Sequence, residues 1–452
     1  MTPPRIDSKT TTTTRREFLG KASAAAAGAA LVSAIGARSY AAENNTIKIA
    51  LIGCGGRGSG AAHEALSTKG PTKLWAAADV FEHRMQASLQ GLERAKKQQA
   101  EVPKERQFVG LDAYRKAIDA LDKGDVVILA TPAGFRPIHF EYAVQKGVNV
   151  FMEKSFAVDA PGVLRLQKAG EASVQKNLKV AGGLMWRHCA AREEAIKRIH
   201  DGQIGELTML RAYRMHGPCG YTPKQPGMNE LGHQISNYNS FTWLNSSFFV
   251  DWHIHNVDTC CWAKNAWPIN AQGMGGRAAR QAPDQMWDHY LVEYTFADGA
   301  KFFAQTRQMD KCYGIYSDIV HGTKGSAILM ESLSAPNSRL YKGHVQTSEN
   351  EIWRHKAPVP NPYQLEHDLL FDAIRNDKPY NETERCAKAC MAAIMGRMAA
   401  HSGKLVSWEE ASNSKLELAP GLEQYTWESN PPVLPDAQGR YPYAVPGETK
   451  EL

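Results

Sequence analysis

Short apolar runs alternate with longer mixed stretches through the first part of the chain, from Ile47 to about Gly183. The apolar runs have the length of buried strands, and the mixed stretches have the length of helices that cover a sheet. Strands separated by helices predict a parallel sheet with right-handed crossovers. The expected strands are 47–52, 74–78, 108–109, 126–130, 148–152 and 178–182, with helices beginning near residues 59, 82, 114, 138 and 160. The pattern therefore predicts an α/β domain with a doubly wound parallel sheet.

Beyond about residue 184 the strand-like runs follow one another without helices between them. The expected elements are a helix over 192–200, strands over 208–215, 289–296, 300–306 and 317–328, and helices over 364–374 and 384–400. Asp298-Gly299 is a hairpin signal between two of the strands. This predicts an α+β domain with a largely antiparallel, open sheet, and the last helix is expected to return to the first domain.

The length of 452 residues favours two domains over a single core. We expect the first domain over 43–183 and the second over 184–418. The segment 419–452 is rich in proline, glycine and aromatic residues, which favours an extended tail laid over a surface.

A glycine-rich turn follows the first predicted strand and precedes the first predicted helix. Glycines in this position let the backbone approach a pyrophosphate, and a helix beginning near Ser59 directs its N-terminal amides toward the phosphates. Asp79 ends the second strand, where its carboxylate can accept both ribose hydroxyls, and its charge favours NAD over NADP. A glycine-rich turn of another α/β protein is the alternative to this Rossmann-type nucleotide domain. The cofactor-binding candidates of the turn are Gly53, Cys54, Gly55, Gly56, Arg57 and Gly58.

The amino-acid composition excludes few functional classes of protein. Hydrophobic residues make up 43% and charged residues 22%, which is ordinary for a globular protein. The net charge of +6 is modest and comes without a dense basic run, so nothing favours a nucleic-acid partner. Eight cysteines fit no metal-binding pattern, and the sequence specifies no disulfide pairing. No apolar stretch reaches the ~20 residues of a membrane span.

The first 42 residues resemble a bacterial Tat export signal. Arg15-Arg16 precedes a weakly apolar segment over 22–37, and small residues follow at Ser39-Tyr40-Ala41-Ala42. A disordered, alanine-rich leader with a chance arginine pair is the alternative. On the export interpretation, the mature protein begins near Ala42 and works in the periplasm or outside the cell.

Two clusters carry candidate chemistry. Glu153-Lys154 lies at the carboxyl end of a predicted strand, where open α/β sheets bind ligands, and Lys154 can donate a hydrogen bond to a substrate oxygen. An ordinary surface lysine is the alternative there. On a helix, Asp251, His255 and Asp258 share one face. One carboxylate can then orient the imidazole, which would remove a hydroxyl proton as a hydride leaves the same carbon.

The same His/Asp group could instead bind a metal. Hydride transfer to NAD needs no metal when a lysine and a histidine supply the acid and base, so we assign no metal site. The aromatic and polar stretch over 215–249 suits either a sugar platform or a structured loop. Further candidate substrate contacts are His253, Asp258, Arg187 and Tyr238.

These motifs together resemble the Gfo/Idh/MocA family, the glucose–fructose oxidoreductase and inositol dehydrogenase group. The resemblance spans residues 47–408 and rests on the glycine turn and on Asp79, Thr131-Pro132 with His139, Glu153-Lys154 and Asp251-x-x-x-His255-x-x-Asp258. It implies Lys154, Asp251 and His255 as the catalytic group, and a sheet whose open face often meets another subunit, hence a homodimer or homotetramer. Ser155 stands where the family usually has proline, and His253 where it usually has glycine.

The leading hypothesis is an exported, NAD-dependent oxidoreductase that acts on a sugar, polyol or glycoside hydroxyl. Because free NAD is not supplied outside the cytoplasm, the enzyme is expected to retain its cofactor tightly. One alternative is an NAD-dependent glycosidase that works by transient oxidation and elimination. The other is a non-catalytic sugar-binding protein that keeps its nucleotide.

Overall fold

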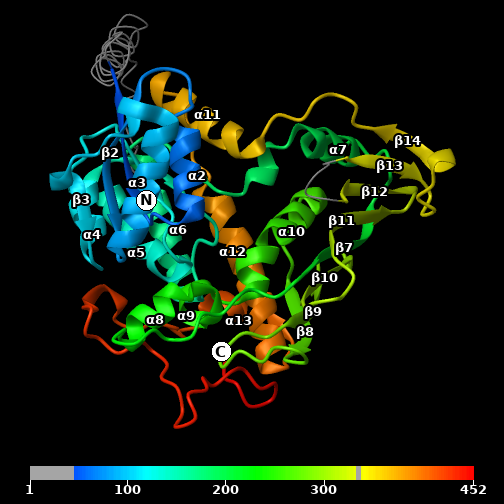
Figure 1. Ribbon diagram of the computed structural model, residues 1–452. Helices are drawn as coiled ribbons and strands as arrows, with labels where there is room; N and C mark the ends of the chain where they lie inside the picture. Colours follow the sequence, from blue (N-terminus) through cyan, green and yellow to red (C-terminus); the bar gives the residue numbers. More distant parts are fainter. Residues whose placement is uncertain (1–44, 332–336) are drawn as a thin grey trace, which may run out of the picture.

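A six-stranded parallel sheet forms the first half of the chain, in the order β3-β2-β1-β4-β5-β6 (Figure 1). The computed structural model describes residues 45–331 and 337–452, so the predicted export signal lies outside the described residues. The strands are β1 Ile47–Ile52, β2 Thr72–Asp79, β3 Gln107–Val109, β4 Val126–Leu129, β5 Asn149–Met152 and β6 Val180–Gly182. The helices between them are α2 Gly56–Ala65, α3 Glu82–Lys96, α4 Ala113–Asp119, α5 Arg136–Lys146 and α6 Ala160–Gln175. The predicted doubly wound α/β fold is confirmed.

A nine-stranded sheet follows, in the order β14-β13-β12-β11-β7-β10-β9-β8-β15. Its pairings are antiparallel except for β7 with β10, which confirms a largely antiparallel sheet. The strands are β7 Leu207–His216, β8 Asn270–Gly276, β9 His289–Thr295, β10 Lys301–Gln308, β11 Ile315–Gly322, β12 Gly325–Met330, β13 Arg339–Lys342, β14 Glu351–Arg354 and β15 Val406–Ser407.

The single strand predicted over 317–328 is wrong, because the chain turns at Thr323 and Lys324 and makes the two strands β11 and β12. Glycines flank the turn, and both lie against backbone: a Cβ at Gly322 would lie 2.2 Å from the Ile204 carbonyl oxygen, and one at Gly325 would lie 2.2 Å from that of Tyr341. The sequence does carry a turn signal there, Gly322-Thr323-Lys324-Gly325, which the prediction of a single strand overlooked. The short strands β8, β13, β14 and β15 also lacked a visible alternation.

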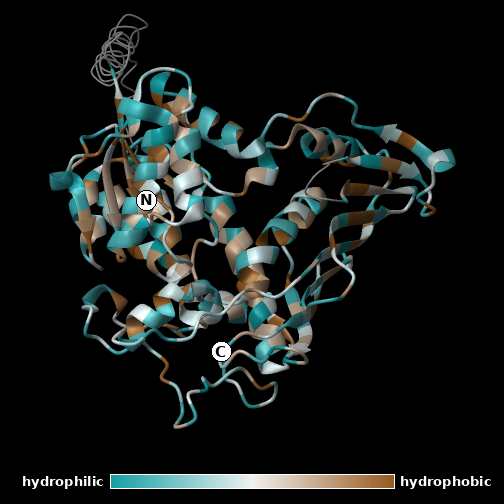
Figure 2. Cartoon of the chain, in the orientation of Figure 1, coloured by the Kyte–Doolittle hydropathy of each residue, from teal (hydrophilic) through white to brown (hydrophobic). Residues whose placement is uncertain are grey.

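One face of the second sheet is covered by helices. The helices of this half are α7 Ala190–His200, α8 Glu230–Ser236, α9 Thr242–Asn245, α10 Phe248–Lys264, α11 Pro362–Arg375, α12 Thr383–Ser402 and α13 Trp408–Asn413. Helix α10 packs on β7, β10 and β11, and α12 lies between α6, α10 and β8. Side chains of β10 alternate between half-buried and buried. Figure 2 colours the chain by hydropathy and shows hydrophobic residues in the strands of both sheets.

Short 3₁₀ turns complete the described chain: η1 Lys97–Ala100, η2 Lys104–Arg106, η3 Ala133–Phe135, η4 Met185–His188, η5 Tyr238–Ser240, η6 Ser348–Asn350 and η7 Leu422–Gln424. After α13 the chain runs without another helix or strand except η7. Its end is held at Glu451, whose carboxylate accepts hydrogen bonds from Arg397 at 2.8 Å and His401 at 2.9 Å. Within 45–331 and 337–452, no helix has the length and apolar character needed to cross a membrane.

Candidate active site

The glycine turn has two tight positions and two open ones. Gly53 has φ +92°, and a Cβ there would lie 2.6 Å from the carbonyl carbon of Ala130; a Cβ at Gly58 would lie 1.9 Å from the oxygen of Gly53. By contrast, nothing lies within 4 Å of a Cβ built on Gly55 or Gly56. Helix α2 begins at Gly56, three residues earlier than predicted, so its first amides face this open space. The turn therefore fits a pyrophosphate in front of Gly55 and Gly56.

Asp79 is fixed at the end of β2 by two backbone amides. Its Oδ2 accepts from the N–H of Cys54 at 2.7 Å, and its Oδ1 accepts from that of Phe81 at 2.9 Å. The carboxylate remains half-buried on the wall of a cleft at the carboxyl edge of the parallel sheet. Carboxylate oxygens each have a second acceptor site, so Asp79 is positioned to bind ribose hydroxyls.

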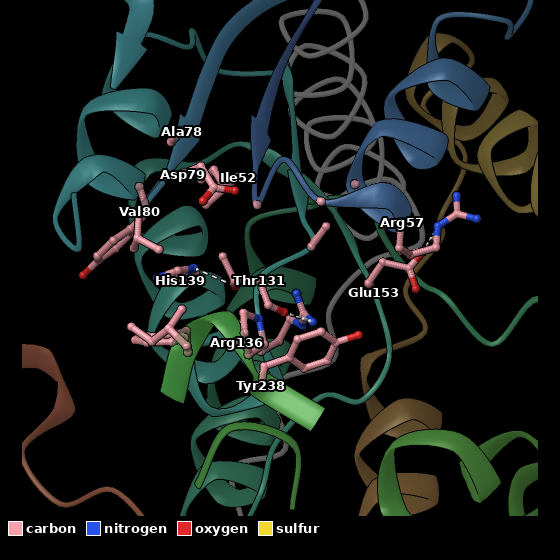
Figure 3. A pocket seen from close by; sticks show the side chains of 18 of the residues that line it. Ile52, Arg57, Ala78, Asp79, Val80, Thr131, Arg136, His139, Glu153 and Tyr238 are labelled. Carbon is pink, nitrogen blue, oxygen red and sulfur yellow. Dashed lines mark hydrogen bonds and ion pairs between the residues drawn. The ribbon is translucent and has the colours of Figure 1, made fainter. Parts of the chain in front are cut away.

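The same cleft gathers most of the predicted cofactor residues (Figure 3). Those that line it are Gly53, Gly55, Gly56, Arg57, Gly58, Asp79, Thr131, Pro132, His139, Glu153 and Lys154, together with Tyr238 and Asp251. Cys54 does not fit its predicted role, because its thiol is buried and donates to the carbonyl of Ala78 at 3.5 Å. Only its backbone belongs to the turn.

His139 and Thr131 form part of the wall. Thr131 Oγ1 lies 3.3 Å from His139 Nδ1, and the imidazole stacks on Tyr114 with ring centroids 4.1 Å apart. Burial and the nearby charge of Arg136 lower the pKa of His139 to about 3, so its ring is neutral at physiological pH. A neutral ring is a packing and hydrogen-bonding surface here, not a proton carrier.

Glu153 and Arg57 are paired at another side of the cleft. Arg57 Nε lies 2.9 Å from Glu153 Oε1, and the same guanidinium contacts Glu64. Burial raises the pKa of Glu153, and the charge of Arg57 opposes that shift. The pair fixes Arg57 beside the glycine turn, where a cation can face a phosphate.

Lys154 joins the nucleotide domain to helix α10. Its Nζ donates to the backbone oxygen of Asp251 at 2.6 Å and to Oδ1 of the same residue at 3.0 Å. Ser155 Oγ donates to that carboxylate at 3.3 Å, and the Lys154–Ser155 peptide is cis. The ammonium is thereby held at the carboxyl end of β5, on the edge of the cleft.

His255 lies one turn further along α10 and is not oriented by either carboxylate, which corrects the prediction. Asp251 is bound to Lys154, and Asp258 accepts two hydrogen bonds from Arg187, both at 2.7 Å. The buried Nδ1 of His255 has no hydrogen-bond partner among the described residues. Both carboxylates are bound by basic side chains from other parts of the chain. The positions of residues along one helical face do not reveal such partners. Burial and the charge of Lys154 hold the pKa of His255 well below its usual value.

Arg187 and Asp258 therefore form a buried ion pair, and neither is among the described residues lining the cleft. We expect Asp258→Asn to lower the free energy of unfolding by about 3 kcal/mol, because it leaves a buried guanidinium without its counter-charge. Urea unfolding measures this. Asp298→Asn is the matched control: Asp298 is exposed and pairs with Lys264, so its loss should cost less than about 1 kcal/mol. Wild-type stability with a raised KM for Asp258→Asn would instead place Asp258 against substrate.

The two remaining substrate candidates, Tyr238 and His253, lie in different environments. Tyr238 lines the cleft, but His253 is fully buried against Phe249, with ring centroids 5.3 Å apart. The stretch over 215–249 folds as a loop followed by the short helices α8 and α9, held by side-chain contacts: Tyr221 Oη lies 2.9 Å from His233 Nε2, and Trp243 Nε1 donates to Gln234 at 2.7 Å. In the described part of the chain, no group of three or more potential ligands could hold a metal ion.

Sequence reasoning missed three polar side chains in the cleft wall, which are Arg84, Tyr114 and Arg136. Arg136 begins α5 just beyond the end of β4 and donates to the carbonyls of Thr131 and Ser155, at 2.6 and 3.4 Å. Its place at a helix start on the carboxyl edge of the sheet was a usable signal. Arg84 and Tyr114 lie within polar helices and gave none.

Known proteins with a similar sequence are polyol dehydrogenases. Inositol 2-dehydrogenase 1 of Paenarthrobacter aurescens (strain TC1) is 26% identical over 201 residues, which cover 44% of this chain and 54% of that protein. The match thus spans about half of that relative's length. No family profile matches the chain.

Solved structures extend the likeness over most of the fold. Aldose–aldose oxidoreductase of Caulobacter crescentus, complexed with glycerol, has a TM-score of 0.62 at 17% identity, covering 80% of this chain and 99% of its own. Scyllo-inositol dehydrogenase of Lactobacillus casei, with NAD(H) and scyllo-inositol, has a TM-score of 0.59 at 20% identity, with 80% and 99% coverage. These comparisons support the Gfo/Idh/MocA resemblance. The structural likeness covers both the nucleotide domain and the open sheet described above.

Proposed function

We propose that this chain is a nicotinamide-dependent oxidoreductase of the Gfo/Idh/MocA family that oxidises a CH–OH group of a sugar or polyol. The observation that carries the proposal is the place of Lys154: its ammonium lies where the wall of the cleft beside the glycine turn meets helix α10. The similarity to inositol dehydrogenases supports the same substrate class.

Lys154 and His255 have different roles in this reaction. When bound, the nicotinamide supplies a hydride acceptor. Lys154 donates a hydrogen bond to the substrate oxygen, and its contacts with Asp251 hold the ammonium in place. His255 is neutral at pH 7, because its pKa lies well below the usual value, so it is free to accept the hydroxyl proton. Proton and hydride thus leave the same CH–OH group toward different acceptors.

We further propose that the enzyme is exported by its twin-arginine leader, keeps its cofactor through turnover, and assembles through the open face of the second sheet as a dimer or tetramer. The export proposal rests on Arg15-Arg16 and the small residues up to Ala42. Retention follows from it, because a nucleotide lost outside the cytoplasm is not replaced. The retained NADH is then reoxidised by passing its hydride to the carbonyl group of a second sugar or back to the same molecule. NAD is favoured over NADP because Asp79 would repel a 2′-phosphate.

The nucleotide itself tests these proposals. We expect the mature chain, purified without added nucleotide and then denatured, to release NAD or NADH in near-stoichiometric amount. Asp79→Asn should lower the affinity for NAD and raise the ratio of NADP to NAD affinity by about 10-fold, because one charge is removed. Asp112→Asn, an exposed aspartate that pairs with Lys116, is the control. Release of NADP would overturn the role of Asp79, and an empty protein would contradict retention.

A further inference from the structure

Arg214 is a partly buried cation that forms no ion pair with any residue of 45–331 or 337–452. It lies on β7, and its Nε is shielded from solvent without a hydrogen-bond partner among the described residues. The guanidinium is held between two aromatic rings, 3.9 Å from the centroid of Tyr316 and 5.2 Å from that of Trp252. The arginines nearby differ: Arg187 is bound to Asp258, and Arg192 lies 3.1 Å from Asp318.

The sheet places other unpaired polar groups beside it. Thr306 on β10 and Tyr316 on β11 are the register partners of Arg214, so the three form one row beneath α10 (Figure 1). Thr306 is 2% exposed, and its hydroxyl has no partner in the described part of the protein. A buried hydroxyl and guanidinium left without acceptors cost free energy unless a ligand supplies them.

The row lies close to the proposed catalytic group. Trp252, whose ring centroid lies 5.2 Å from the guanidinium of Arg214, directly follows Asp251 on α10, and Asp251 binds Lys154. Arg214 therefore neighbours the segment of α10 to which Lys154 is bound. Asp318, the acid on the neighbouring strand, is bound by Arg192 and by Asn256 at 2.6 Å, and Arg214 also acts on its charge. Two arginines thus face one aspartate, and the group keeps one positive charge in excess.

We propose that the substrate is an acidic sugar, a hexuronate or aldonate, whose carboxylate binds the guanidinium of Arg214 beside the hydroxyl of Thr306. This rests on the proposed function and names its substrate class. A planar guanidinium matches a carboxylate with two parallel hydrogen bonds. One uncompensated positive charge matches a single carboxylate, whereas a dianionic phosphate would bring an excess negative charge among neutral groups.

Binding tests this without turnover. Titration calorimetry on the NADH-loaded protein compares glucuronate, galacturonate and gluconate with glucose, galactose and glucitol, and with glucose 6-phosphate. We expect the best acid to bind at least 10-fold more tightly than its neutral counterpart. Arg214→Met should reduce its affinity about 10- to 100-fold, the worth of a charge-assisted bidentate contact. Arg214→Lys should lose part of this affinity, because lysine keeps the positive charge but cannot form the two parallel hydrogen bonds of a guanidinium.

Arg211→Met is the matched control, because Arg211 lies on the same strand but on the opposite face, where it donates to His321 and Tyr213. It should keep the preference for acids. A second readout is thermal unfolding of the ligand-free protein: Arg214→Met should leave the Tm unchanged or raise it, since it removes an uncompensated cation.

Three results would overturn the inference: no acid binding better than its neutral counterpart, glucose 6-phosphate binding best, or an Arg214→Met protein several degrees less stable. A failure of the proposed function looks different, because the protein would then either bind no nicotinamide nucleotide or hold NAD that no sugar or polyol, acidic or neutral, reduces.

Discussion

Lys154→Met should lower kcat by about 1000-fold while leaving the affinity for NADH within about 3-fold of wild type. Methionine keeps the length of the side chain but cannot donate to a substrate oxygen, so the loss falls on the transition state in which that oxygen gains charge. Steady-state rates and nucleotide titration measure the two quantities. The larger effect should be on kcat, not on KM.

Lys146→Met is the matched control, because Lys146 is an exposed lysine at the end of α5 that pairs with Asp119. It should retain wild-type rates. Asp251→Asn separates chemistry from position: its backbone oxygen still holds Lys154, so kcat should fall less than in Lys154→Met. A Lys154→Met enzyme with wild-type kcat would exclude this lysine from the reaction.

His255→Asn should lower kcat/KM by about 100- to 1000-fold, because asparagine is similar in shape to part of the imidazole but cannot accept a proton at neutral pH. The pH dependence of the rate tests the role of His255 independently. The reaction needs neutral His255, and the positive charge of Lys154 and burial both hold its pKa below the usual 6.5. The rate of wild type should therefore stay constant as the pH falls to about 6.5 and decline only below it.

Removing a positive charge next to His255 favours its protonated form, so the acid limb of the residual Lys154→Met activity should move to higher pH. His200→Asn is the control, because His200 is bound to the carbonyls of Trp262 and Ala263 at the end of α7, away from the cleft. An unchanged acid limb in Lys154→Met, or wild-type rates in His255→Asn, would contradict the role of His255 as base.

The nucleotide half could be predicted closely from the sequence because its signals are local. A strand, a glycine turn and a helix are consecutive, so the tight positions at Gly53 and Gly58 and the acid at Asp79 follow from spacing alone. The gathering of Thr131, His139, Glu153 and Lys154 follows from the rule that the carboxyl ends of parallel strands share one edge.

The second half could be predicted less well because its site depends on contacts between distant segments. The helical face of 251–258 was visible, but the partners of its carboxylates, Lys154 and Arg187, lie 97 and 71 residues away in the chain. Likewise, Arg214 reads as an ordinary half-buried strand residue until the register of β7 with β10 and β11 is known. Pairing choices of this kind are set by tertiary packing, not by local pattern.

Single-turnover reduction of the bound nucleotide tests the central claim most directly. The protein loaded with stoichiometric NAD is mixed with hexoses, hexuronates, aldonates and inositols, and the absorbance band of reduced nicotinamide is followed in wild type and Lys154→Met. We predict that at least one of these compounds produces close to one NADH per subunit in wild type, and that the rate falls about 1000-fold in the variant. If NAD is bound but no compound in any class reduces it, the protein holds a nucleotide without using it, and the oxidoreductase assignment is wrong.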